Sequence, residues 1–292
     1  MTSTGTGTST GAGSTLTPRN IYLVRVGLPD QPTEPAEPVA ATPGLVLPDF
    51  LTPELWLLGR PEQIEVSTSG SLSWVDKTEN GYVYETFDTG GTGPELAADG
   101  NGVKFNGTAN TGGSSGALSD FSILRCRANP GMIRNGATVW VVYDDLASIQ
   151  EGALICTYRG EFRTYMGTST VKAFRRSPFA NQEADWQASG AQAGVSGGAV
   201  LVEAQFGLAI TSEVLARLNN GAVRSSGFSG VSPGTLVFDY IGAFRRPNTG
   251  QADFPLAATV REIVVTHQAG LTDLQLQTVR ENLMDRWGID YV

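Results

Sequence analysis

The segment ATVREIVVTHQAGLTDLQLQTVRENLMDRWGI, residues 258–289, decides the fold because it joins one strand to one capped helix. Its first part is rich in β-branched residues, which favours a strand. Thr272 then predicts an N-cap, and Gln275 three positions later completes a capping box. Gly288 is typical of the residue just past a helix end. The segment therefore predicts a helix over residues 272–287.

This helix has one narrow apolar face, which predicts that it lies on a sheet. The apolar residues of that face are Leu276, Val279, Leu283 and Trp287. The residues expected to point away from it are Gln277, Arg280, Glu281 and Asp285.

Most of the chain before the helix consists of short strand-like runs separated by turns. The clearest runs are residues 71–76, 81–87, 102–107, 137–143, 152–158 and 198–206. Asn220-Gly221 predicts a type I′ hairpin turn with positive φ angles, and 36 glycines suit a fold with many tight turns. This pattern predicts an antiparallel sandwich or jelly roll.

Composition excludes several classes of function. The formal net charge of −9 argues against a nucleic-acid-binding surface, which needs clustered positive charge. No apolar run is long enough to predict membrane insertion, and the first residues lack the features of a secretory signal. Cys126 and Cys156 each lie in an apolar run, so we expect reduced, buried thiols in a protein made in the cytoplasm.

Residues 1–50 have the composition of an arm and linker, and residues 51–292 that of a domain. Residues 2–17 include 14 Thr, Ser or Gly, and six prolines lie between Pro29 and Pro48. Between these stretches lies one short strand-like run that has no hairpin partner beside it. Its residues, which we expect to pair with another protein, are Ile21, Tyr22, Leu23, Val24 and Val26.

Several motifs over residues 54–289 resemble the LamG-like, concanavalin A-like jelly-roll domains of phage and bacterial surface proteins. They are ELWLLGRPEQIEVSTSGSLSWVDKTENGYVYE, GNGVKFNGTAN, YIGAFRRP and the closing strand and helix. Ala243 stands where the family pattern has a second glycine, and Arg286 where lysine is usual. The resemblance implies an all-β, concanavalin A-like antiparallel sandwich with one closing helix, and it implies no single activity.

The sequence offers no convincing catalytic group. His267 is the only histidine, and the three Gly-x-Ser-x-Gly matches lack a strand-turn-helix context. Sandwich enzymes that cleave glycans need paired carboxylates, and the nearest candidates are Glu183 and Asp185. We therefore expect a protein that is not an enzyme.

Two binding hypotheses follow from the remaining motifs. ADGNGV, residues 98–103, hints at a calcium loop, but a tight turn explains it better because Val103 stands where a third oxygen ligand is needed. We expect no cofactor. Tyr165, Phe179 and Trp186 lie in loop-like segments, where aromatic rings are candidates for glycan contacts.

These observations predict a virion structural protein of a tailed phage or phage-like particle, assembled in the host cytoplasm. Capsid decoration, head fibre or spike, and tail fibre are all open. The expected partners are other virion proteins through the arm, further copies of the chain, and host surface polysaccharide. The alternative is a secreted bacterial glycan-binding adhesin or a glycosidase-related module.

Overall fold

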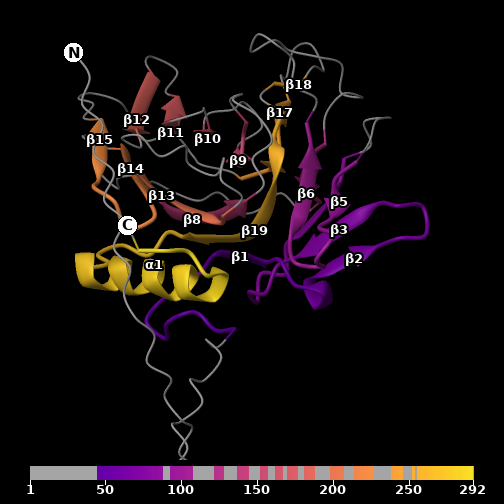
Figure 1. Ribbon diagram of the computed structural model, residues 1–292, viewed down its shortest axis with the longest axis horizontal. Coiled ribbons are helices and arrows are strands. Elements are labelled where there is room, and N and C mark those ends of the chain that lie inside the picture. The colour runs from indigo at the N-terminus through magenta and orange to yellow at the C-terminus, as the bar shows by residue number, and fades with distance from the viewer. Residues whose placement is uncertain are drawn as a thin grey trace, which may run out of the picture. The chain divides into compact units, whose positions relative to one another are not determined.

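The computed structural model describes residues 45–87, 93–107, 122–127, 137–144, 152–156, 162–166, 170–176, 181–187, 198–206, 214–226, 238–245, 252–253 and 255–291. All of these residues belong to one compact unit. Within them, antiparallel strands form two layers, and one α-helix follows the last strand (Figure 1). The expected antiparallel sandwich with a closing helix is therefore confirmed.

The first layer is an eight-stranded sheet in which β1 and β6 pair with the same side of β19. In spatial order its strands are β15 (Arg224–Ser226), β14 (Val214–Leu218), β13 (Val200–Phe206), β8 (Ala137–Asp144), β19 (Ala257–Thr266), β6 (Val103–Asn106) and β5 (Glu95–Leu96), with β1 (Leu55–Leu58) also on β19. β19 is thus the strand that most of this layer is built around.

The second layer contains a six-stranded sheet and a three-stranded sheet. The six strands are β2 (Ile64–Val66), β3 (Leu72–Val75), β4 (Val83–Thr86), β7 (Leu124–Cys126), β16 (Tyr240–Ile241) and β9 (Ile155–Cys156). The three strands are β10 (Phe162–Met166), β11 (Thr170–Arg176) and β12 (Asn181–Gln187), with β10 beside β9. The remaining short elements are η1 (Pro61–Gln63), β17 (Phe244–Arg245) and β18 (Ala252–Asp253).

The core lies between the two layers because successive side chains of a strand point to opposite faces. In β8, Val139 and Val141 face the second layer, and Trp140 and Val142 face the other way. From the second layer, Trp74 joins Val139 and Val141 in the same buried cluster. β8 is therefore buried on both faces, which explains its nearly continuous apolar sequence.

α1 (Asp273–Trp287) lies on the outer face of the eight-stranded sheet (Figure 1). The capping box predicted at Thr272 and Gln275 is present, and Gly288 ends the helix with a left-handed φ of 62°. The buried residues of the helix are Leu276, Val279, Arg280, Leu283 and Met284. Arg280 was expected to point away from the sheet, and that expectation is wrong. Trp287 packs on the same cluster but is only partly buried.

Arg280 is buried because it pairs with a carboxylate inside the helix–sheet interface. Its Nη1 lies 2.8 Å from Oε2 of Glu203 on β13, and the two side chains are 4% and 2% exposed. The Trp140 indole donates to the same carboxylate oxygen at 2.9 Å, and Gln205 donates to the other at 2.7 Å. Buried charge is tolerable here because both carboxylate oxygens accept hydrogen bonds.

A second buried pair fastens the other end of the helix. Arg286 donates to Oε1 of Glu262 on β19, and both side chains are 1% exposed. The indoles of Trp56 and Trp287 donate to the two oxygens of this carboxylate at 2.7 and 2.6 Å. Burial raises the pKa of Glu262, and Arg286 and the two indoles oppose that shift.

A β-bulge in β19 places Glu262 on the helix side. The register between β19 and β8 shifts between Val260 and Glu262, so Arg261 is the extra residue. Before the bulge, Val260 faces the core between the layers; after it, Ile263 does so and Val264 faces the helix. The bulge therefore lets two consecutive charged residues serve different partners in a strand that is otherwise apolar.

The bulge also requires a close approach by Gly102. A Cβ on this residue would lie 2.6 Å from the Val260 carbonyl oxygen and 3.1 Å from Cδ of Arg261. Its φ of 104° is a conformation that favours glycine. Any side chain at position 102 would therefore push the β5–β6 turn away from β19.

The predicted hairpin after β13 exists, but its turn is placed differently. β14 and β15 pair with Ala216 opposite Arg224, which leaves a longer connection than a two-residue turn. The positive φ, 47°, belongs to Asn219 and not to Asn220-Gly221. The Asn219 side chain accepts a hydrogen bond from the Leu201 backbone at 2.8 Å, and this tie to β13 explains why the left-handed residue is Asn219.

Met284→Ala should lower the free energy of unfolding by about 2–5 kcal/mol, the usual cost of emptying a buried site of this size. Met284 is fully buried under α1, and Leu274, at 72% exposed, is the matched control on the same helix. Leu274→Ala should change the free energy by less than about 0.5 kcal/mol. Denaturant unfolding followed by circular dichroism measures both. Equal costs for the two variants would contradict the described packing of the helix.

Candidate functional site

The outer face of the six-stranded sheet carries a cross-strand row of polar side chains. The register aligns Glu65, Ser73, Glu85 and Arg125 across β2, β3, β4 and β7. The strand neighbours that point inward and are fully buried are Leu72, Trp74, Tyr84 and Leu124. Side chains in such a row touch one another, so they form one continuous surface.

The charges in this row do not pair as the register alone would suggest. Glu85 lies directly opposite Arg125, but its carboxylate lies 3.1 Å from Nη1 of Arg127 instead. The guanidinium of Arg125 lies 5.5 Å from the centroid of the Phe87 ring. Within the part of the chain that the structure describes, no hydrogen bond or ion pair joins this guanidinium to another side chain.

Phe87 is itself held by a buried cluster on the same face. Its ring meets that of Tyr240 edge to face, with centroids 6.2 Å apart and planes at 86°. Tyr240 is 1% exposed, and Cys156 beside it is fully buried with a bond to the Ala243 carbonyl at 3.3 Å. The expectation that Cys126 and Cys156 are buried free thiols is confirmed. Phe87 therefore gives Arg125 a fixed support, and cation–π contact orients the guanidinium.

A signal for this site lies in the sequence of β7 and its flanking residues. In residues 123–127, ILRCR, arginines alternate with Leu124 and Cys126, which places both arginines on the face opposite the core. Arg125 and Arg127 are exposed accordingly. The contact with Phe87 depends on the pairing of β4 with β7, which a single sequence does not reveal.

The aromatic residues proposed for glycan contact lie differently from the expectation. Tyr165 and Trp186 belong to strands β10 and β12, so their assignment to loops is wrong. In the backbone register Tyr165 pairs with Lys172 of β11, and Trp186 pairs with the preceding residue, Val171. They thus occupy neighbouring rows, and neighbouring rows belong to opposite faces of a sheet. Phe179 lies outside the described residues, as do Ile21, Tyr22, Leu23, Val24 and Val26 of the arm.

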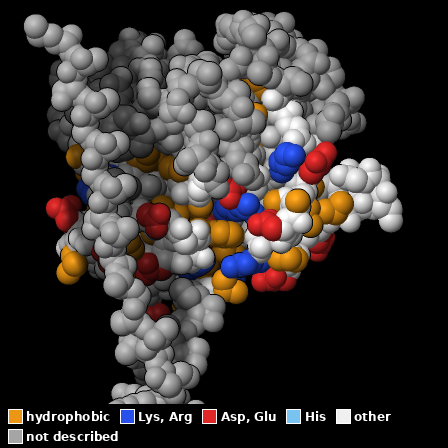
Figure 2. Space-filling view, in the orientation of Figure 1, with side chains coloured by type: hydrophobic (Ala, Val, Ile, Leu, Met, Phe, Trp, Pro, Cys, Tyr) orange, Lys and Arg blue, Asp and Glu red, His pale blue; other side chains and the backbone are white. Residues whose placement is uncertain are grey.

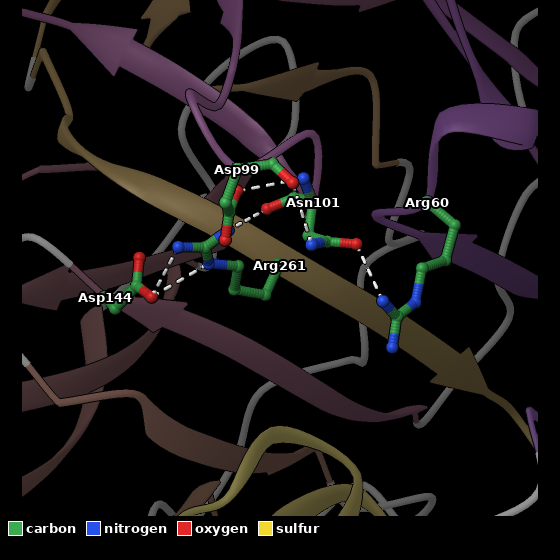
Figure 3. A network of polar contacts seen from close by, with 5 residues as sticks. All are labelled: Arg60, Asp99, Asn101, Asp144 and Arg261. Atoms are coloured by element: carbon green, nitrogen blue, oxygen red, sulfur yellow. Dashed lines mark hydrogen bonds and ion pairs between the residues drawn. The ribbon is translucent and has the colours of Figure 1, made fainter.

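In the loop considered for calcium, oxygen atoms of Asp99 and Asn101 bind the guanidinium of Arg261 (Figure 3). Nη1 of Arg261 lies 2.8 Å from both carboxylate oxygens of Asp99 and also donates to the Asn101 carbonyl. The same guanidinium donates to Asp144 at 2.8 Å, and Arg60 donates to the Asn101 side chain at 2.7 Å. These contacts form a polar network that joins this loop to β8 and β19. The tight-turn interpretation is the better one, as expected.

This polar network shifts the pKa values of Asp99 and Arg261. Partial burial would raise the pKa of Asp99, but the Asn101 backbone and Arg261 outweigh it and lower the pKa below 3.8. Burial opposes the charge of Arg261 as well, yet Asp144 and Asp99 raise its pKa. Both groups are therefore held in their charged forms.

The described residues contain no constellation that suggests nucleophilic or metal-dependent catalysis. His267 is exposed at the end of β19, and its Nδ1 lies 3.4 Å from the Glu54 carboxylate. No group of three potential metal ligands occurs among these residues. Nor does this part of the chain include a helix with the length and apolar character needed to cross a bilayer.

Figure 2 shows acidic and basic side chains beside one another on the described part of one face, with no large area of a single sign. This mixture agrees with a formal net charge of −9 that is spread along the chain. A polyanion such as nucleic acid binds best to a continuous basic area, which the described part of this face does not offer.

Solved structures share the fold of this chain. The receptor binding domain of botulinum neurotoxin mosaic serotype C/D matches 80% of this chain with a TM-score of 0.53 and 12% identity. The binding domain of botulinum neurotoxin serotype D matches 80% with a TM-score of 0.51 and 13% identity. This chain covers 51% of each of these structures. A carbohydrate-binding module, the CBM40 of a Ruminococcus gnavus sialidase bound to α2,6 sialyllactose, matches 50% of this chain, which covers 84% of it, at a TM-score of 0.38 and 13% identity.

No protein-family model and no curated protein matches the sequence. At these identities the neurotoxin domains establish the β-sandwich fold and nothing about a ligand. The chain is therefore similar in fold to jelly-roll recognition domains, and its function has to be argued from its own surface.

Asp99→Asn should remove a pH-dependent contribution to stability. The lowered pKa of Asp99 means that this contribution is fully present above pH 3.8, and that it is lost as the pH falls through the lower native value. The variant should therefore be less stable than the wild type at neutral pH, and the difference should shrink as the pH falls to about 2.

Unfolding by urea at a series of pH values measures this difference. Asp49→Asn, at an exposed carboxylate outside the network, is the matched control. A difference for Asp99→Asn that stays constant with pH would mean that the Arg261 contact does not favour the charged carboxylate.

Proposed function

We propose that this chain is a non-enzymatic recognition module of a tailed phage or phage-like particle, and that it binds surface glycans of the host. The exposed guanidinium of Arg125, which lies on Phe87 without an ionic partner among the described residues, is the observation that carries the proposal. A glycan site needs an apolar ring against which sugar C–H groups pack and polar groups that accept or donate hydrogen bonds. Phe87 and Arg125 supply both within one surface.

The location of α1 supports this choice of surface. The helix covers part of the outer face of the eight-stranded sheet, where Arg280 and Arg286 hold it, so a ligand cannot reach that part without displacing it. On the six-stranded sheet, Arg125 and Arg127 are exposed on the corresponding outer face. The polar row therefore lies on a sheet face that the helix does not cover.

The particle role rests on the first 50 residues, whose Thr, Ser, Gly and Pro content suits an arm that folds onto a partner. The described residues at the end of this stretch pack on the β-sandwich. Leu47 and Leu51 are buried in the cluster under α1, and the Val46 carbonyl accepts a bond from Arg286 at 2.7 Å. Lys77 donates to the Leu45 carbonyl at 3.3 Å. A truncation that tests the arm should therefore keep Leu45 and all residues after it.

The alternative, a secreted adhesin or glycosidase-related module, uses the same fold. Glu183 and Asp185 lie in β12 with one residue between them. The distance between their carboxyl groups decides whether such a pair can cleave a glycosidic bond. Activity on a bound polysaccharide would favour the glycosidase alternative, and we expect none.

Phe87→Ala should weaken glycan binding at least about tenfold, or 1.4 kcal/mol, as expected for the loss of one central contact. Tyr291→Ala is the matched control, because Tyr291 is an exposed aromatic residue that follows α1. Binding of the full chain to an array of bacterial surface polysaccharides identifies the ligands, and calorimetry compares the variants. The proposal fails if no glycan binds, or if both variants bind as the wild type does. Release of reducing sugar during the assay would instead indicate an enzyme.

A chain that lacks residues 1–44 should keep the melting temperature and glycan binding of the full chain but should not assemble into particles. Residues 45–291 contain all three buried clusters of the described residues, so removal of residues 1–44 leaves these clusters intact. Complementation of particles that lack the protein, followed by immunoblotting of purified particles, measures incorporation. Normal incorporation of the shortened chain would contradict an anchoring role for residues 1–44.

A further inference from the structure

We infer that the glycan is acidic, and that the guanidinium of Arg125 binds a carboxylate on it. This inference rests on the proposed glycan site and adds the class of its ligand. The evidence is an ion pair on the outer face of the six-stranded sheet. Glu85 is the cross-strand neighbour of Arg125, but it binds Arg127.

The cross-strand position is where an arginine normally finds its carboxylate, because directly opposite charges attract. Glu85 occupies that position but lies 3.1 Å from Arg127 instead. The Glu85 side chain is 39% exposed and that of Arg127 is 75% exposed. An ion pair so exposed to water contributes little to stability. Because Glu85 binds Arg127, the planar donor group of Arg125 stays available to a ligand.

The chemistry of a guanidinium selects the ligand. It has five N–H donors and no acceptor, and two of its parallel donors match the two oxygens of a carboxylate. A neutral sugar offers hydroxyl groups, which compete with water on equal terms and cannot form the charged pair. Contact with Phe87 orients the fork before the ligand arrives, which lowers the entropy lost on binding.

The neighbouring carboxylates limit how much negative charge the ligand can carry. Glu65 and Glu85 lie in the same row as Arg125, and Glu65 is exposed at the edge strand β2. A ligand with a charge on every unit would place some of its charges against these two residues. The surface therefore suits a polysaccharide in which a uronic acid alternates with neutral sugars, and it disfavours a densely sulfated chain.

Binding of the full chain to hyaluronan oligosaccharides tests the inference, because they alternate a uronic acid with a neutral amino sugar. Carboxyl-reduced hyaluronan is the matched ligand, and heparin represents dense negative charge. We expect hyaluronan or another alternating uronic acid polysaccharide in the panel to bind at least tenfold more tightly than its carboxyl-reduced form. Heparin should bind more weakly than the alternating polymer.

Three variants connect this preference to the site. Arg125→Lys keeps the charge but loses the planar fork, and we expect at least a tenfold loss of affinity. Glu85→Gln removes the competing carboxylate, and we expect affinity that is equal to or tighter than that of the wild type. Lys104→Gln, an exposed charge on β6 of the other layer, is the control and should change affinity less than twofold. Melting temperatures show whether each variant is folded.

The outcomes separate this inference from the proposed function. If neutral glycans bind as tightly as acidic ones and Phe87→Ala still weakens binding, the site stands and the inference is wrong. If acidic glycans bind but Arg125→Lys behaves like Lys104→Gln, the carboxylate binds elsewhere and the inference is also wrong. If no carboxylated polysaccharide in the panel binds, the acidic ligand is excluded. The inference is supported if Arg125→Lys lowers the affinity for the acidic polymer selectively, and if the wild type binds the carboxyl-reduced polymer more weakly than the native polymer.

Discussion

One extra residue in β19 is the constraint on which the rest of this structure depends. Because the bulge lies between Val260 and Glu262, Arg261 and Glu262 turn to different partners although they are consecutive. Arg261 binds Asp99 and so holds the β5–β6 turn, and Glu262 receives Arg286 of the closing helix. A regular strand would have placed Glu262 on the same face as Val260, in the apolar core, where an unpaired carboxylate costs several kcal/mol (~3–5).

Arg60 connects the polar network of Arg261 with that of Glu262. It donates to the Asn101 side chain at 2.7 Å, and its guanidinium lies 5.1 Å from the centroid of the Trp287 ring. Turn, strand and helix are thereby fixed together at one end of the eight-stranded sheet. The helix is held on the sheet by buried charge as well as by apolar packing, so the part of that face beneath the helix serves the stability of the fold.

Local signals in the sequence predicted much of the fold. The capping box at Thr272 and the glycine at 288 determine the helix ends by short-range hydrogen bonds, so they could be read directly. The strand-like runs at residues 137–143 and 198–206 predicted β8 and β13. By contrast, the buried role of Arg280 depends on Glu203, 77 positions away, and helix periodicity alone assigned it to solvent. The strands that contain Tyr165 and Trp186 were predicted as loops, because their pairing with β11 is a contact that one sequence does not reveal.

The candidate site was the least predictable part. Arg125 and Phe87 are 38 positions apart and meet only because β4 pairs with β7, and the freedom of Arg125 depends on which of two arginines Glu85 binds. The most direct measurement is a crystal structure of the full chain with an acidic oligosaccharide. The account predicts a sugar on the outer face of the six-stranded sheet, packed on Phe87, with a carboxylate bound by Arg125. A sugar bound at the Asp99 loop, along α1 or on any other surface would contradict it.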